Sequence, residues 1–148
     1  MLPSRYFSDL TQPEIAAQLK KNPLVILPCG SVEQHGPHLP LETDTRIAQA
    51  YLARVRETLS KNIPATFLPI EQVGISTEHT AFLGTQTLST DAALKSWMGL
   101  GDSIAKAGIR KLVIVTSHGG NSAAMALIAQ DLRAKHQMLA VTTSWSRF

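Results

Sequence analysis

The chain has 148 residues, 44% of them hydrophobic and 17% charged, with a formal net charge of +3. This composition is typical of one globular domain and excludes a disordered tail. The 14 lysines and arginines are scattered, so no nucleic-acid partner is expected. No signal peptide is visible, no apolar run spans a bilayer, and Cys29 is the single cysteine. We therefore expect a cytoplasmic protein with no membrane contact and no internal disulfide.

Helix and strand signals alternate along the chain. Thr11 can cap the start of a first helix, and Glu14 is favourable in its first turn because that end of a helix is positive. Leu24–Leu27 is a run of apolar residues with branched side chains, which predicts a buried strand that ends at Pro28. Further helices are expected at residues 44–61, 90–107 and 122–136, and further strands at 65–68, 111–116 and 139–143. The segment 69–88 between them is too long for a simple connector.

The expected order is α-β-α-β-α-β-α-β within a single domain, residues 1–148. Strands that alternate with helices pair in parallel through right-handed crossovers. We therefore predict the α/β class, as a three-layer α/β/α sandwich with a mainly parallel sheet.

Two unusual loops begin where predicted strands end. The first contains Glu33 and His35, which point to the same side if the backbone is extended, and then leads to Asp44. The second contains His118. Ligands of open parallel sheets bind beyond the carboxyl ends of the strands. Two carboxylates and two imidazoles at that edge favour Zn²⁺ or Mn²⁺ over a metal that prefers thiolates.

Three blocks of the sequence resemble the creatininase (creatinine amidohydrolase) family. They are Gly30-Ser-Val-Glu-Gln-His-Gly-Pro-His-Leu-Pro40 followed by Thr43-Asp44, then Gly74–Thr85, then Ser117-His-Gly-Gly-Asn121. In the middle block, Leu83 stands where the family usually has proline. The resemblance covers nearly the whole chain in the expected order.

The resemblance implies that Glu33, His35, Asp44 and His118 are metal ligands, with Asp44 bridging two divalent ions, Zn or Mn. It implies hydrolysis of a C–N bond in a cyclic or linear amide, in which a metal-bridging hydroxide attacks the carbonyl. The implied partner is a small-molecule amide substrate. Family members are homo-oligomers, often hexamers, so we expect an oligomer.

Six further residues are candidates for catalysis or substrate binding. Gly119 and Gly120 let backbone N–H groups approach an oxyanion at a helix start, or they form only a tight turn. Asn121 is expected to fix this turn by side-chain hydrogen bonds or to contribute to the substrate site.

The remaining candidates lie in the two long loops. His38 is a catalytic candidate that orients a ligand, or it is a loop histidine packed between prolines. His79 is a catalytic candidate that lines the substrate pocket, and Ser76 is a candidate substrate contact. Glu78 is interpreted as an exposed charge.

The chain also departs from the family. Members continue past the last predicted strand into a block, His-Ala-Gly-x-x-Glu-Thr-Ser, whose glutamate resembles a metal ligand and whose histidine resembles the catalytic acid/base. Creatininase itself has a glutamate at the position of Gly120. The second metal site is therefore expected to be incomplete and the proton donor missing.

Three explanations stay open for this shortness. The chain is a C-terminally truncated fragment, a natural short member completed by another subunit, or a binding protein that has lost turnover. We favour the fragment, because parallel-sheet domains seldom end on an exposed apolar edge strand. The rival function is a non-catalytic α/β binding or assembly subunit whose Gly119–Gly120 helix start holds an anion.

Overall fold

The computed structural model of the chain describes residues 4–148. Residues 1–3, part of the segment in which no signal peptide is expected, lie outside the described residues. Four strands form one parallel sheet in the order β2-β1-β3-β4. Their bounds are β1 (Leu24–Cys29), β2 (Ala65–Phe67), β3 (Lys111–Thr116) and β4 (Leu139–Ser144).

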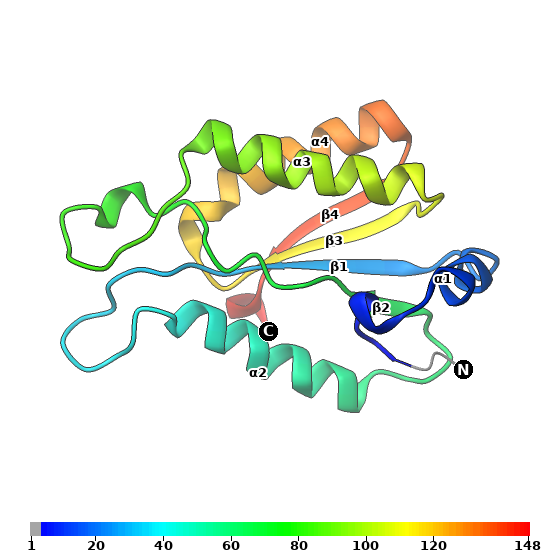
Figure 1. The fold of residues 1–148 in the computed structure, drawn as a ribbon, viewed down its shortest axis with the longest axis horizontal. Coiled ribbons are helices and arrows are strands. Elements are labelled where there is room, and N and C mark those ends of the chain that lie inside the picture. Colours follow the sequence, from blue (N-terminus) through cyan, green and yellow to red (C-terminus); the bar gives the residue numbers. More distant parts are fainter. Residues whose placement is uncertain (1–3) are drawn as a thin grey trace.

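Four α-helices accompany the sheet, with bounds α1 (Gln12–Leu19), α2 (Thr43–Thr58), α3 (Thr90–Lys106) and α4 (Ser122–His136). Helices α3 and α4 lie together over one face of the sheet, and α2 covers the other (Figure 1). Short α1 lies beside the amino ends of the strands. The predicted three-layer α/β/α sandwich with a parallel sheet is therefore confirmed.

Apolar side chains fill both layers between helices and sheet. On the α3–α4 side, Trp97, Ile128 and Leu132 pack against strand residues such as Leu27, and all are almost fully buried. A smaller cluster lies on the α2 side, formed by Leu52, Phe67, Val115 and Trp145. Burial of one such side chain contributes about 1.5–3 kcal/mol, so these two layers hold the helices to the sheet.

Local signals explain where most elements begin and end. The Thr11 amide donates to the Glu14 carboxylate at 2.8 Å, which starts α1 as expected. The Ser89 hydroxyl accepts from the Ala92 amide at the start of α3. Gly108, with φ of 93°, follows the end of the same helix.

The expectation that β1 ends before Pro28 is wrong, because the strand continues to Cys29. Pro28 pairs with Val115 of β3, while the register with β2 stops at Ile26. The Pro28 carbonyl accepts a hydrogen bond from the Glu71 amide, which lies beyond the end of β2. The N–H that proline lacks would point to the same side of the strand. Proline costs no ladder hydrogen bond there, and the strand can run through it.

The strand order creates a switch point between β1 and β3. After β1 the chain enters α2 on one face, and after β3 it enters α4 on the other (Figure 1). The loops that follow these two strands therefore diverge around a crevice at the carboxyl edge of the sheet. Both predicted ligand loops lie there.

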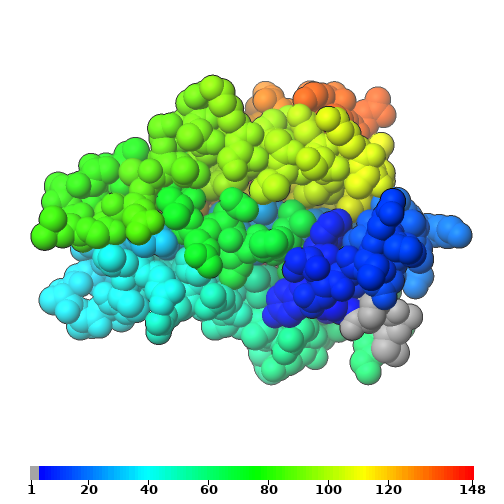
Figure 2. Space-filling model, viewed as in Figure 1, coloured from blue at the N-terminus to red at the C-terminus, as the bar shows by residue number. Residues whose placement is uncertain are grey.

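The two long loops lie side by side beyond this edge. Val32 forms an antiparallel bridge with Gln86, and the Gln34 amide donates to the Thr85 hydroxyl at 3.2 Å. Figure 2 shows the two segments, cyan and green, in contact at one end of the molecule. The segment 69–89 is thus anchored to the first loop rather than free.

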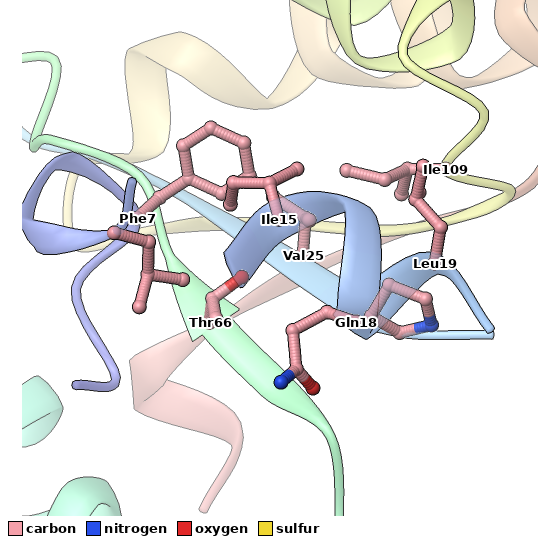
Figure 3. Close-up of a pocket in the computed structure, with 9 residues that line it drawn as sticks. Phe7, Ile15, Gln18, Leu19, Val25, Thr66 and Ile109 are labelled. Atoms are coloured by element: carbon pink, nitrogen blue, oxygen red, sulfur yellow. The ribbon is translucent and has the colours of Figure 1, made fainter. Parts of the chain in front are cut away.

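A separate pocket lies at the opposite, amino end of the sheet (Figure 3). Helix α1 covers it, and almost all of its lining is apolar, including Phe7, Ile15, Leu19 and Ile109. It brings no metal-ligating side chains together. Between residues 4 and 148, no helix is long and apolar enough to cross a membrane.

Candidate metal centre

Four side chains predicted as ligands converge at the switch point of the sheet. Glu33 and His35 follow β1, Asp44 lies in the first turn of α2, and His118 follows β3. His118 Nδ1 lies 3.2 Å from Glu33 Oε1 and 3.4 Å from Asp44 Oδ2. His35 Nε2 lies 3.6 Å from the same Asp44 oxygen and 3.9 Å from Glu33 Oε1. The two imidazoles and two carboxylates form one compact group.

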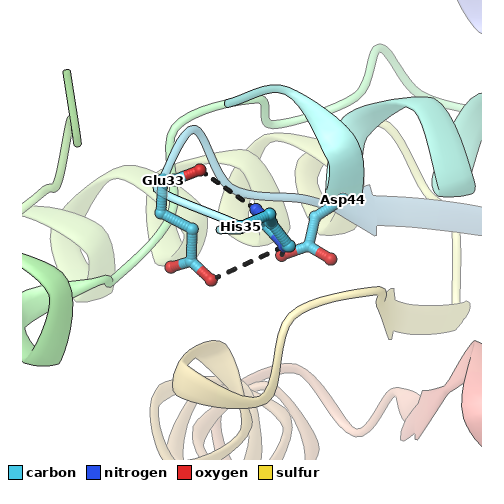
Figure 4. Close-up of side chains that lie close together, drawn as sticks. All are labelled: Glu33, His35 and Asp44. Carbon is cyan, nitrogen blue, oxygen red and sulfur yellow. Dashed lines mark hydrogen bonds and ion pairs between the residues drawn. The ribbon is translucent and has the colours of Figure 1, made fainter. Parts of the chain in front are cut away.

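The first loop presents its ligands through alternation along extended backbone. Ser31, Glu33 and His35 follow one another at every second residue, and their side chains share one side. Ser31 is fully buried, and its hydroxyl donates to Asp44 Oδ2 at 2.6 Å. Figure 4 shows Glu33, His35 and Asp44 directed toward a common point. Ser31 thereby holds the Asp44 carboxylate in position.

Backbone carbonyl groups fix the orientation of both imidazoles. His35 Nδ1 lies 3.0 Å from the Glu33 carbonyl oxygen, and His118 Nε2 lies 2.8 Å from the Ile75 carbonyl oxygen. A carbonyl oxygen only accepts, so these nitrogens carry the protons. The other nitrogens, His35 Nε2 and His118 Nδ1, face the carboxylates. Metal-ligating histidines characteristically have this arrangement.

The electrostatics of the site favour ionised carboxylate beside imidazole. Burial raises the pKa of the Asp44 carboxyl, but hydrogen bonds from His118 and Ser31 and the nearby imidazoles outweigh it, so that pKa lies below its ordinary value. Burial lowers the pKa of His118, but Asp44, the Ile75 carbonyl and Glu33 outweigh it and raise that pKa. Both directions follow from the close approach of the Asp44 carboxylate to the His118 ring.

The residues present fit a divalent cation. Glu33 is only 4% exposed, and its Oε2 atom is buried with no hydrogen-bond partner among the described residues. A buried carboxylate oxygen without a donor is costly, and a cation would satisfy it. Two groups of possible ligand atoms, each within 4.8 Å, share this residue: Glu33–His35–Asp44 and Glu33–Glu78–His118.

The structure places the two candidate catalytic histidines differently. His79 Nε2 lies 3.6 Å from Glu33 Oε1, and its Nδ1 lies 3.2 Å from the Gln34 side-chain nitrogen. His79 therefore borders the cluster. His38 is exposed, and none of the hydrogen bonds or ion pairs found within residues 4–148 joins it to the four clustered side chains. Ser76 is fully buried, with its hydroxyl 3.5 Å from His118 Nε2.

The turn after His118 is held together by Asn121. Its side-chain oxygen accepts from the Ile75 amide at 2.9 Å, and its nitrogen donates to the Gly30 carbonyl at 2.9 Å and to Thr116 at 3.1 Å. The Asn121 side chain is completely buried. It ties the three loops of the site to one another, as expected for a residue that fixes the turn. Gly119 and Gly120 open this turn as a short 3-10 helix before α4.

Two residues of the site were missed or undervalued by sequence reasoning. Ser31 was not singled out, although its spacing from Glu33 and His35 is the signal that could have found it. Glu78 is exposed, as predicted, but one of its oxygens also lies 3.7 Å from His118 Nε2. No local pattern reveals this approach, because it depends on how the 69–89 segment folds back.

Fold and site together define a parallel α/β protein with a cluster of carboxylates and imidazoles, a candidate metal centre, at the switch point of its sheet. The profile of the creatininase family, described as creatinine amidohydrolase, matches residues 8–148. The chain therefore belongs to the creatininase family, as the three sequence blocks predicted.

The relatives of known function are hydrolases. The mycofactocin precursor peptide peptidase of Mycobacterium tuberculosis (strain CDC 1551 / Oshkosh) is 41% identical over 124 residues, or 77% of this chain and 47% of the peptidase. The creatinine amidohydrolase of Pseudomonas putida is 29% identical over 128 residues, or 82% of this chain and 48% of that enzyme. The chain thus spans about half the length of these curated relatives.

Solved creatininase structures share the fold. The manganese form superposes with a TM-score of 0.83 at 26% identity, covering 97% of this chain and 59% of the creatininase chain. A mutant creatininase of the Zn-Zn type gives a TM-score of 0.82 over the same shares of both chains. Those proteins hold manganese or zinc, which agrees with the ligand types assembled here.

Proposed function

We propose that this chain carries the metal centre of a metal-dependent amidohydrolase that cleaves a C–N amide bond. One observation carries the proposal: Glu33, whose Oε2 atom is buried with no hydrogen-bond partner within residues 4–148, belongs to a cluster of two carboxylates and two imidazoles. A buried carboxylate oxygen that has neither a hydrogen-bond donor nor a bound cation lowers the stability of the folded protein. A divalent cation both compensates this oxygen and supplies hydrolytic chemistry.

Glu33, His35, Asp44 and His118 would hold two divalent ions, Zn²⁺ or Mn²⁺. When bound, such ions activate water near neutral pH and polarise an amide carbonyl. Asp44 Oδ2 faces both His35 and His118, which suits it to a position between the ions. Ser31 and the Ile75 carbonyl keep Asp44 and His118 oriented for this task.

His79 is the better placed of the two histidines to move a proton to the leaving nitrogen. It lies on the loop that borders the cluster, its Nε2 faces Glu33, and its ring is partly exposed. Gln34 contacts its Nδ1 and so orients the ring. His38 is exposed on the other loop, and no hydrogen bond or ion pair found between residues 4 and 148 joins it to the cluster. The backbone N–H groups of Gly119 and Gly120 remain candidates for holding the developing oxyanion.

The two curated relatives described above favour an amide substrate. One is named a precursor peptide peptidase and the other a creatinine amidohydrolase, and both names describe cleavage of C–N bonds. The peptidase has the higher identity, so a linear peptide amide is the first substrate class to test and creatinine the second.

We also infer a homo-oligomer. Leu83 is 97% exposed at the loop tip, Phe82 beside it is 52% exposed, and Leu139 on edge strand β4 is 60% exposed. Phe82 and Leu83 lie beyond the carboxyl edge of the sheet and Leu139 at the amino end of β4, so they belong to two separate surfaces, and exposed apolar patches mark contact sites. Light scattering of the purified chain, with and without added Zn²⁺, measures the assembly directly.

Metal content tests the proposed function most directly. The purified chain is loaded with Zn²⁺ or Mn²⁺ and then dialysed against metal-free buffer, and the bound ions per chain are counted by elemental analysis. Stoichiometric binding, together with release of amine from short peptide amides, is the expected result. A chain that retains no divalent ion would overturn the proposal and favour a non-catalytic binding module.

A further inference from the structure

The position of Gly120 has no room for a side chain. A Cβ atom built there would lie 2.3 Å from the Ile75 carbonyl oxygen, 2.4 Å from His118 Nε2 and 2.9 Å from Glu78 Oε1. The first of these contacts is with backbone, which cannot move aside cheaply. No larger residue at this position could be accommodated by this backbone.

The space beside Gly120 already contains a carboxylate. Glu78 belongs to the short 3-10 helix η2 (Thr77–His79), and its Oε1 atom lies 3.7 Å from His118 Nε2. Its side chain is 48% exposed, so the carboxylate reaches the centre from the solvent side. A carboxylate thus approaches this side of the metal centre from a different segment of the chain.

The surroundings of Glu78 favour a role as a metal ligand over a role as a hydrogen-bond partner of His118. His118 Nε2 already donates to the Ile75 carbonyl at 2.8 Å, and the Glu78 oxygen is too far away to share this proton. A carboxylate oxygen of Glu78, one of Glu33 and a ring nitrogen of His118 lie within 4.8 Å of one another. Of these groups, Glu33 has a buried oxygen, Oε2, with no hydrogen-bond partner in the part of the chain that the structure describes.

We propose that Glu78 is a ligand of the second divalent ion, in place of the side chain that Gly120 lacks. The ligands then divide naturally: His35 and Glu33 at one position and His118 and Glu78 at the other, with Asp44, whose Oδ2 faces both imidazoles, between them. Each position has a shared carboxylate, a further carboxylate and an imidazole. This inference rests on the proposed function, since it assumes that the centre binds divalent ions.

The test compares Glu78→Gln with wild-type chain by calorimetric titration with Zn²⁺ and by elemental analysis. We expect two ions per chain in wild type and one in Glu78→Gln, because the amide keeps the size of the side chain but loses its charge. Glu57→Gln is the matched control: that glutamate is 60% exposed and pairs with Arg54 on α2. It should retain both ions.

Two outcomes separate this inference from the function on which it rests. If wild type and Glu78→Gln bind the same number of ions with the same affinities, the role of Glu78 is wrong while the metal centre stands. If wild type binds no ion, the proposed function itself fails. Glu78→Asp, which keeps the charge on a shorter side chain, should bind the second ion more weakly than wild type but more tightly than Glu78→Gln.

Discussion

His118 Nδ1 lies 3.2 Å from Glu33 Oε1, although the two residues follow different strands. They meet because β1 and β3 are neighbours in the sheet, paired in parallel from Leu24–Lys111 to Cys29–Thr116. Both loops therefore leave the sheet at the same edge. The contact between a ring nitrogen of His118 and the buried Glu33 carboxylate marks the centre of the site.

Asp44→Asn should remove metal binding. Asp44 faces both His35 and His118. Asparagine would place an uncharged amide oxygen between the two proposed metal positions. Removing a residue that only hydrogen-bonds to a metal ligand lowers metal affinity by about 10–100-fold. Because Asp44 is itself proposed as a ligand, we expect its replacement to lower the affinity by more than about 100-fold. Titration with Zn²⁺ measures it. Asp91→Asn, at an exposed carboxylate paired with Lys95, is the control and should bind as wild type does.

Ser31→Ala should weaken metal binding without unfolding the protein. The buried Ser31 hydroxyl orients Asp44 by the 2.6 Å hydrogen bond, so its loss should lower affinity by about 10–100-fold. Ser103→Ala, which removes an exposed hydroxyl bonded to Gly99 within α3, should leave the affinity unchanged. Equal affinities for wild type and Ser31→Ala would show that this hydrogen bond does not position Asp44.

Gly120→Ala and Gly119→Ala should differ sharply in stability. A Cβ at Gly120 meets the Ile75 carbonyl oxygen at 2.3 Å, whereas a Cβ at Gly119 meets nothing within 4 Å. Overpacking costs about 1–3 kcal/mol, so Gly120→Ala should lower the free energy of unfolding by that amount. Gly119→Ala should change it by less than about 0.5 kcal/mol. Urea unfolding followed by circular dichroism compares the two, and similar losses in both variants would contradict the packing described for the turn.

Asn121→Ala should destabilise the whole site. The substitution strands the Ile75 amide and the Gly30 carbonyl inside the protein, and each buried group left unsatisfied costs about 1–3 kcal/mol. We expect the free energy of unfolding to fall by about 3 kcal/mol in total. Asn62→Ala, at an exposed position before β2, should be nearly neutral. A small effect at Asn121 would mean that other groups tie the loops together.

Bound metal should raise the thermal stability of the chain. A ligand present at 100 times its dissociation constant adds about 2.7 kcal/mol to the free energy of unfolding when only the folded state binds it. Adding Zn²⁺ should therefore raise the melting temperature of wild type, and chelation should reverse the change. The melting temperature of Asp44→Asn should not respond; a comparable rise in that variant would place the stabilising ion elsewhere.

Sequence reasoning anticipated the elements and their order well, because period and capping are local properties. The Thr11 start of α1, the end of α3 before Gly108 and the strand at residues 111–116 all agree with the structure. Pro28 was misjudged because the cost of a proline in a strand depends on what lies beside it. Here the neighbour β2 is too short to need its N–H.

The amino-acid sequence by itself determined the parallel α/β class, the family and the two loops that bear carboxylates and imidazoles, since periodicity and motif spacing are written along the chain. The metal-ligand roles of Glu33, His35, Asp44 and His118 remain predictions. Only the tertiary structure decided which side chains share the centre, bringing in Ser31, His79 and Glu78 and leaving His38 in solvent. The physical reason is that these contacts join segments from different strand ends, whose distances depend on the packing of the sheet and loops.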